Sequence, residues 1–312
     1  MNDFSRRRFL KSGAIAAASV TMSMLDISDA AVSPPSWSIG CFNRPWMQKF
    51  GSPVQPLSTP QPANWGFDTA LKGIKKAGFK TVGLLTPMPG EPFIGAEASD
   101  DYLVELKKKI EHSGLSATMG SLHTNFSNSL DDAIQQTRRQ IDHAHYLDLE
   151  WLLTFGVDKK SEYENYYRVM ADAADYAEAR SLKLVLKPHG GGSGASEEIL
   201  RCLSQVNRPN FKIWYDAGNI IYYTGKDPVE ELKPIAQYVT GFCAKDCGGR
   251  ESDVMIQFGT GKVDFAAVYS ALKNAGFNGP TFIECAGGKS FDEVTQDARL
   301  NRLYLEKIFK KL

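Results

Sequence analysis

The chain reads LKGIKKAGFKTVGLL over residues 71–85 and LKNAGFNGPTFIE over residues 272–284, and the two stretches share one plan. In each, a helical pattern stops at a glycine, Gly78 or Gly276, and a short apolar run follows. Glycine readily adopts the left-handed conformation that ends many helices, and such an apolar run is typical of a strand buried on both faces. The repeated unit is therefore a helix, a glycine stop and a buried strand.

The same unit recurs along the chain and predicts eight strands separated by helices. Eight alternations of this length favour a closed (β/α)8 TIM barrel of the α/β class over an open doubly wound sheet. No nucleotide-binding glycine loop follows the first strand, so no nucleotide cofactor is expected. The strands are predicted at residues 38–41, 81–85, 116–120, 151–155, 183–187, 211–215, 241–245 and 281–284, and helices at residues 102–112, 130–147, 161–180, 196–205, 228–238 and 265–274.

The amino terminus carries the features of an export signal. The motif SRRRFLK at residues 5–11 precedes a small, uncharged run over residues 12–25 and a small-residue cleavage region near residues 28–30. This order matches a twin-arginine signal, and the run is shorter than the roughly 20 residues that a bilayer span needs. We therefore predict a signal peptide over residues 1–32, a barrel domain over residues 36–312 and a periplasmic or otherwise exported protein. An uncleaved anchor is the alternative.

Charge and cysteine content exclude several classes of function. The 36 basic residues equal the 36 acidic ones, so no net field attracts nucleic acid or an anionic membrane. A small carbohydrate of neutral or weak charge is the expected partner, with no membrane contact beyond the export signal. The five cysteines lack metal-finger spacing, and a chain of this size does not need disulfides.

Two long loops follow the first two predicted strands. Residues 48–64 are rich in proline, and residues 87–99 combine proline with glycine. In a barrel these connections lie over the carboxyl ends of the strands, so we expect them to act as substrate lids.

Polar and ionisable side chains gather where successive strands end. The carboxyl ends of barrel strands surround one site, and burying an unpaired charge is costly. Convergence of charges from neighbouring strands therefore indicates a functional site. The residues are His123 after the third strand, Lys187 and His189 at the fifth, Asp216 and Asn219 at the sixth, Lys245 and Asp246 at the seventh, and Glu284 at the eighth.

Five motifs in this order resemble the xylose isomerase-like barrels of the sugar isomerase and epimerase superfamily. They are LVLKPHGG at 184–191, IWYDAGN at 213–219, CAKD at 243–246, GTGKVDF at 259–265 and FIE at 282–284. The resemblance implies a divalent metal held by Glu, Asp, His and Glu from the fifth to the eighth strand. Asp216 and Glu284 match that set, but Lys187 and Cys243 stand where Glu and His are expected.

Two hypotheses follow for this incomplete set. His189 lies two residues beyond Lys187 and can project to the same side. Together with Asp216 and Glu284 it would hold Mn, Zn or Mg, with Cys243 as a fourth ligand for zinc. Alternatively, the Lys187 ammonium supplies the positive charge and no metal is needed.

The resemblance implies an isomerase or epimerase that removes a proton next to a sugar carbonyl and forms an enediolate. Glu284 is the expected base, Lys187 stabilises the oxyanion, and His189 and Asp216 hold the metal or polarise hydroxyls. The residues expected to bind the sugar are His123, Asn219, Lys245, Asp246 and, by stacking, Trp46. The alternatives are a lyase or hydrolase on 3-keto-glycosides by the same route, and a non-catalytic sugar-binding subunit of an exported oxidoreductase. A homo-oligomer and an oxidoreductase partner both stay open.

Overall fold

The computed structural model describes residues 37–47 and 66–312. The predicted signal peptide and the predicted lid over residues 48–64 lie outside the described residues. Within those residues, no helix is both long enough and apolar enough to span a bilayer.

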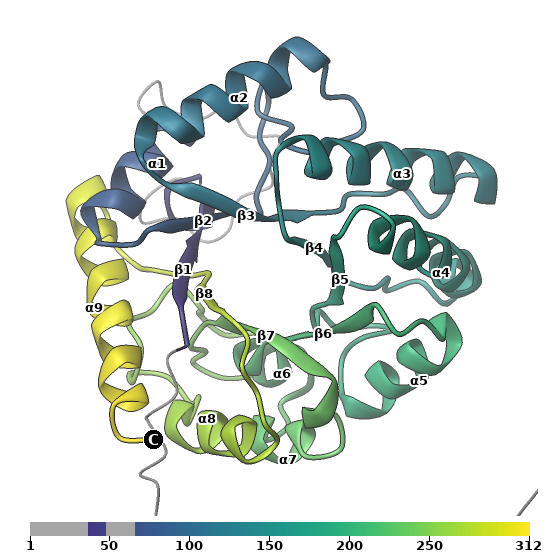
Figure 1. The fold of residues 1–312 in the computed structure, drawn as a ribbon. Helices are drawn as coiled ribbons and strands as arrows, with labels where there is room; N and C mark the ends of the chain where they lie inside the picture. The colour runs from purple at the N-terminus through teal and green to yellow at the C-terminus, as the bar shows by residue number, and fades with distance from the viewer. Residues whose placement is uncertain (1–36, 48–65) are drawn as a thin grey trace, which may run out of the picture. The chain divides into compact units, whose positions relative to one another are not determined.

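Eight parallel strands close into a barrel in chain order (Figure 1). Closure is set by β1, which pairs with β2 on one side and with β8 on the other. All eight predicted strands are present, and their bounds agree with the prediction to within two residues. The strands are β1 (Ile39–Phe42), β2 (Thr81–Leu84), β3 (Ser116–Ser121), β4 (Trp151–Thr154), β5 (Lys183–Leu186), β6 (Phe211–Tyr215), β7 (Val239–Ala244) and β8 (Thr281–Ile283).

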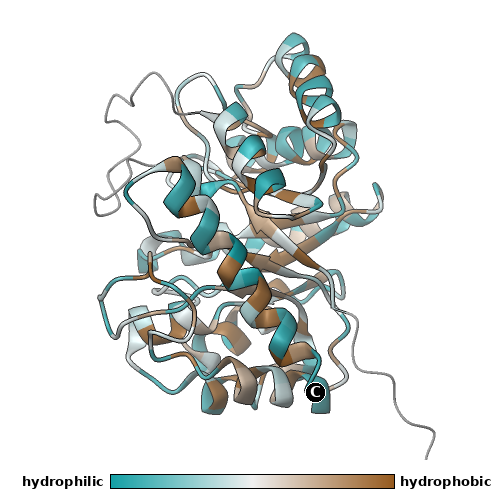
Figure 2. Ribbon diagram, turned by 90° about the vertical axis from the view of Figure 1, so that its left-hand side faces the viewer, coloured by the Kyte–Doolittle hydropathy of each residue, from teal (hydrophilic) through white to brown (hydrophobic). Residues whose placement is uncertain are grey.

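Helices surround the strands, with hydrophilic residues on their outer faces and apolar strands inside (Figures 1 and 2). The predicted helix over residues 228–238 is divided into α7 and a 3₁₀ turn, and α6 and α9 were not predicted. The α-helices are α1 (Phe67–Lys76), α2 (Asp100–Ser113), α3 (Leu130–Tyr146), α4 (Tyr163–Glu178), α5 (Ser196–Val206), α6 (Ala217–Thr224), α7 (Pro228–Leu232), α8 (Phe265–Asn274) and α9 (Phe291–Phe309). The 3₁₀ turns are η1 (Arg44–Trp46), η2 (Lys160–Glu162) and η3 (Ala236–Tyr238).

The helix ends follow from local sequence signals. Gly78 and Gly276 have φ of +89° and +80°, which confirms the predicted left-handed stops. At the opposite ends, the Ser99 hydroxyl accepts the Tyr102 amide at the start of α2, and Ser290 accepts the Glu293 amide at the start of α9. These caps satisfy backbone groups that a helix terminus leaves free.

Apolar side chains fill the barrel interior and separate its two ends. The interior cluster consists of Phe42, Leu85, Met119, Trp151, Leu153, Val185, Trp214, Cys243 and Phe282, and a second, larger core lies between strands and helices. Cys41, Cys202, Cys243, Cys247 and Cys285 are all buried free thiols. The barrel is therefore a packed core with a separate surface at each end.

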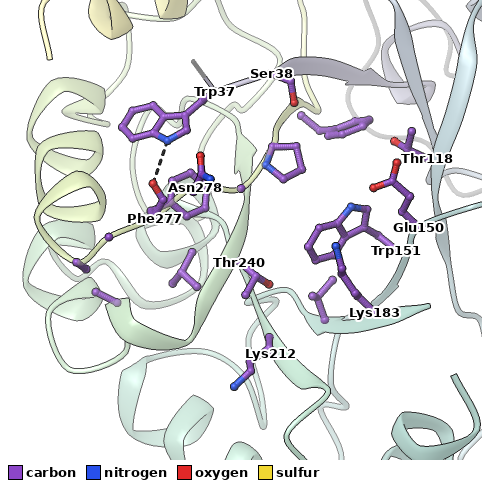
Figure 3. A pocket seen from close by; sticks show the side chains of 18 of the residues that line it. Trp37, Ser38, Thr118, Glu150, Trp151, Lys183, Lys212, Thr240, Phe277 and Asn278 are labelled. Atoms are coloured by element: carbon purple, nitrogen blue, oxygen red, sulfur yellow. Dashed lines mark hydrogen bonds between the residues drawn. The ribbon is translucent and has the colours of Figure 1, made fainter. Parts of the chain in front are cut away.

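Each end of the barrel has a hollow. The one at the amino ends of the strands has a volume of about 700 Å³ (Figure 3). Trp37 and Trp151 flank it, and Lys183 extends its ammonium over the Trp151 ring at 4.4 Å. The hollow at the carboxyl ends of β3 and β4 has a volume of about 350 Å³ and includes His123 and Phe155.

Candidate functional site

Four charged side chains from neighbouring strands form a charge cluster at the carboxyl end of the barrel. Its members are Lys187 after β5, Asp216 after β6, Lys245 after β7 and Glu284 after β8, each at most 3 % exposed. Lys187 Nζ lies 3.1 Å from Asp216 Oδ2 and also contacts Glu284 Oε2. Lys245 Nζ lies 3.2 Å from Asp216 Oδ2 and 3.5 Å from Glu284 Oε1. The structure thus brings these predicted residues together.

Glu284 has two further partners. Arg44, which follows β1, donates from Nη1 to Glu284 Oε1, and the Cys243 thiol donates to Oε2 at 2.8 Å. The Arg44 side chain keeps 20 % of its surface exposed. Arg44 therefore connects the buried charge cluster to the protein surface.

The start of α6 positions the cluster. Asp216 caps this helix, because its Oδ1 accepts the Asn219 amide at 2.8 Å. Asn219 in turn accepts from Lys245 Nζ and donates to the Pro188 carbonyl at 2.6 Å, so it ties β5 to β7. A Cβ at Gly218 would lie 2.5 Å from the Lys245 carbonyl oxygen, so only glycine allows the helix to approach β7 this closely. The motif DAGN is therefore a structural requirement of the site.

The protonation states follow from the surroundings. Burial acts to raise the pKa of Glu284, but the neighbouring cations, Lys187 foremost, hold it well below its ordinary value. Burial acts to lower the pKa of Lys187, but the carboxylates of Glu284 and Asp216 raise it well above its ordinary value. Burial raises the pKa of Cys243. Near neutral pH the lysine is charged, the glutamate is ionised and the thiol keeps its proton.

The site carries one surplus positive charge. Arg44, Lys187 and Lys245 contribute three positive charges, and two carboxylates oppose them. Asp216 Oδ2 has two ammonium groups within 3.2 Å but no well-aligned hydrogen bond. Because buried charge is costly without a counter-charge, the site suits an anion or a group that becomes anionic.

Asp216, Cys243 and Glu284 are close enough to hold a metal ion, since their ligand atoms lie within 4.8 Å of one another. Cys243, the fourth ligand predicted for zinc, belongs to this group, whereas His189 does not. The distances permit a metal, but the donor set fits one poorly. Two lysine ammonium groups already contact both carboxylates, and a divalent cation would add to a positive surplus.

His189 lies beside the charge cluster as a neutral side chain. Burial and the positive charges of Lys187 and Lys245 lower its pKa to about 4. The Tyr223 hydroxyl lies 3.0 Å from Nε2, and the ring packs on Phe155 with centroids 5.4 Å apart. His189 is half-buried, so it combines an unprotonated ring with access from the surface.

His123 also lies near Phe155, with ring centroids 6.2 Å apart, and lines the carboxyl-end hollow. Its Nε2 is 2.8 Å from the Ser121 hydroxyl. The side chain is exposed, yet enough protein surrounds it that desolvation lowers its pKa. Phe155 also lies under the Lys187 ammonium, at 5.7 Å, so this ring joins the hollow to the charge cluster.

Two predicted sugar-binding residues have other roles. Trp46 is fully buried and donates from Nε1 to Thr295 of α9 at 3.2 Å, so its ring packs between helices and cannot stack on a sugar. Asp246 is also fully buried, and its carboxylate accepts only backbone amides among the described residues. Those donors are the amides of Cys247, Gly259, Gly261 and Val263, at 2.8 to 3.1 Å. The GTGKVDF motif therefore folds around Asp246 and shapes a loop.

Three residues of the site were missed in the sequence. Arg44 lies two residues after the first strand, and its position near a strand end is the same signal that identified the other charges. Phe155 lies inside the predicted fourth strand, where an aromatic residue is expected to be part of the hydrophobic core. Tyr223 lies on α6, which shows no clear apolar periodicity. Neither aromatic residue has a sequence signal that separates it from ordinary packing.

The fold is shared with several solved structures. A D-allulose 3-epimerase from Methylomonas sp. is 18% identical, with 88% of this chain and 99% of that one covered at a TM-score of 0.65. A xylose isomerase domain protein from Planctomyces limnophilus is 19% identical over 89% and 99% of the chains, with a TM-score of 0.65. A xylose isomerase-like TIM barrel protein from Mycobacterium smegmatis, in complex with magnesium, is 14% identical over 88% and 97%, with a TM-score of 0.67.

No curated protein matches the sequence. The model of the xylose isomerase-like TIM barrel family matches residues 71–306, which is most of the chain and includes every member of the charge cluster. The protein therefore belongs to the xylose isomerase-like TIM barrel family.

Proposed function

We propose that this protein is an exported carbohydrate isomerase or epimerase that removes a proton from the carbon next to a sugar carbonyl. One observation carries the proposal. Two buried ammonium groups, on Lys187 and Lys245, lie beside the neutral, half-buried ring of His189. The two ammonium groups can stabilise a developing oxyanion, and the imidazole ring can accept a proton.

The chemical step is a proton transfer that leaves an enediolate. His189 takes the proton, the electrons of the broken C–H bond form a carbon–carbon double bond, and the carbonyl oxygen gains the negative charge. Lys187 and Lys245 stabilise that oxygen by charge and hydrogen bonding. An isomer forms if the proton is added to the former carbonyl carbon while the hydroxyl proton moves from the neighbouring oxygen to the old carbonyl oxygen. An epimer forms if a proton, for example from water, is added to the opposite face of the original carbon.

The base in this scheme is His189 and not Glu284, the residue predicted from the sequence. Cations bond both oxygens of Glu284, Arg44 at Oε1 and Lys187 at Oε2, so neither oxygen is free to take a proton from a substrate carbon. Its role is to hold the lysine ammonium groups in place, together with Asp216.

The positive charge that a metal would supply comes in this proposal from the lysines. A bound divalent ion would act as a Lewis acid on the carbonyl oxygen. Lys187 stands where the resemblance places a metal-binding glutamate, and its ammonium contacts both remaining carboxylates. The names of the structural relatives, among them D-allulose 3-epimerase and L-ribulose 3-epimerase, support the reaction class. The twin-arginine motif supports export to the periplasm.

A lyase is the second candidate, and the carboxyl-end hollow favours it. The hollow offers about 350 Å³ next to Phe155, beyond the space where the enediolate would form. A glycosidic leaving group could occupy that space. Expulsion of the group from the carbon next to the enediolate would consume the same electron pair and give an unsaturated sugar.

Proton abstraction is tested by exchange in deuterated water. The purified full-length protein is incubated with ketoses, aldoses and 3-keto-glycosides, and NMR detects deuterium at the carbon next to the carbonyl. We expect incorporation with the wild type and with Lys183→Ala, which changes a lysine at the opposite end of the barrel. Release of an aglycone would select the lyase. Binding without any exchange would contradict the proposal and support the non-catalytic subunit.

A further inference from the structure

Arg44 is the cation of the site that reaches the surface. A guanidinium has five N–H donors in a planar fork. One of them, on Nη1, bonds Glu284, and no other hydrogen bond from this side chain is found within residues 37–47 and 66–312. Its side chain is 20 % exposed, whereas Lys187 and Lys245 are almost fully buried. Donors of Arg44 are therefore available to a ligand that enters from the surface.

We propose that the substrate is a sugar that carries a carboxylate, such as a uronate, and that Arg44 binds this carboxylate. The inference rests on the proposed function and names its substrate class. The surplus of the site is one positive charge, which one carboxylate balances. The planar fork of arginine matches the two oxygens of a carboxylate.

The positions of the cations indicate that two anionic groups of the substrate would bind to different side chains. Lys187 and Lys245 lie at the buried floor, where the carbonyl oxygen of the reacting carbon would sit. Arg44 lies nearer the surface and bonds Glu284 Oε1, which Lys245 also approaches, whereas Lys187 bonds Oε2. A substrate carboxylate on Arg44 and an enediolate oxygen on Lys187 would therefore not compete. The balanced charge of the whole chain fits a small monoanion and not a polyanion.

Paired ligands test the assignment directly. Isothermal titration of the full-length protein compares D-glucuronate and D-galacturonate with their methyl esters, which lack the charge. We expect at least one acid to bind about tenfold more tightly than its ester. Arg44→Gln should remove that preference, and Arg44→Lys should keep only part of it because it lacks the fork. Arg138→Gln is the matched control, since Arg138 pairs with Asp172 on the outer helices, and it should keep the full preference.

The outcomes separate this inference from the proposed function. Equal binding of acids and esters by the wild type overturns the inference, and so does an absence of binding for all of them. A preference that survives in a folded Arg44→Gln protein also overturns it. If Arg44→Gln does not fold, the comparison of acid with ester in the wild type and in Arg44→Lys decides. Deuterium exchange on neutral sugars alone would support the proposed function but refute the acidic substrate. Binding of the acids without any exchange would support the acidic substrate but refute the proposed function.

Discussion

The two ends of the barrel differ in a way that hollow size does not reveal. A hollow of about 700 Å³ lies at the amino end (Figure 3), and charged groups beside it such as Lys183 are exposed. A hollow of about 350 Å³ lies at the carboxyl end, next to charges that are buried and paired. Burying charge is costly, and barrel active sites lie at the carboxyl end. The place where a protein retains buried charges is thus a better guide to chemistry than the volume of a pocket.

Replacing one lysine at each end of the barrel should give the largest difference between the two ends, in both stability and deuterium exchange. Lys187→Met leaves Asp216 and Glu284 buried with fewer partners, which should cost about 3–5 kcal/mol of unfolding free energy. It should also abolish deuterium exchange, because the oxyanion loses a cation. Lys183→Ala, at the amino end, should cost less than about 1 kcal/mol and leave exchange unchanged. Urea unfolding and exchange rates measure both, and similar losses in the two variants would contradict the comparison.

The acid limb of the pH profile should report His189. As a base this residue must be unprotonated, and its pKa is lowered to about 4. We therefore expect kcat/KM to stay level from neutral pH to about pH 5 and to fall near pH 4, whereas an ordinary histidine would titrate near pH 6.5. His189→Gln should lower exchange by about 10²–10⁴-fold and remove this limb. A limb centred near pH 6.5, or one unchanged in the variant, would exclude His189 as the base.

The fold could be predicted from the sequence because local signals agree with the barrel. Glycine stops and short apolar runs identified all eight strands. Ser290 and Glu293 form a recognisable start signal for α9. The helix was not predicted because it follows the eighth strand, where the repeated unit of helix and strand ends. The helix α6 was missed because it is short and largely buried, so its apolar residues show no one-sided pattern.

Only the site residues that lie at the ends of predicted strands could be identified from the sequence. Lys187, Asp216, Lys245 and Glu284 meet because parallel strands deliver their carboxyl ends to one place. What a strand end does not reveal is the direction of a side chain. Asp246 follows β7 as Lys245 does, but its carboxylate bonds backbone amides of its own loop. Likewise Trp46 follows β1 as Arg44 does, but its ring is buried against helices.

Removal of metal should have the smallest effect. Because lysine ammonium groups contact both carboxylates, dialysis against a chelator should leave the exchange rate of the wild type unchanged. Elemental analysis before and after dialysis checks that any bound metal has been removed. Loss of exchange that returns with Mn²⁺, Zn²⁺ or Mg²⁺ would show that a metal, and not Lys187, supplies the positive charge.

The same reasoning predicts how a metal site could be created. Lys187→Glu places at the end of β5 the residue that the resemblance associates with metal binding, and it changes the site from a surplus of one positive charge to one negative charge. Three carboxylates and the Cys243 thiol would then surround the space that the ammonium had filled. Carboxylate oxygens suit Mg²⁺ and Mn²⁺, so the variant should bind Mn²⁺ in a titration in which the wild type does not. Equal binding of Mn²⁺ by both proteins would mean that Lys187 does not exclude a cation. The buried ammonium groups would then not be the feature that sets the chemistry of the carboxyl end apart from that of the amino end.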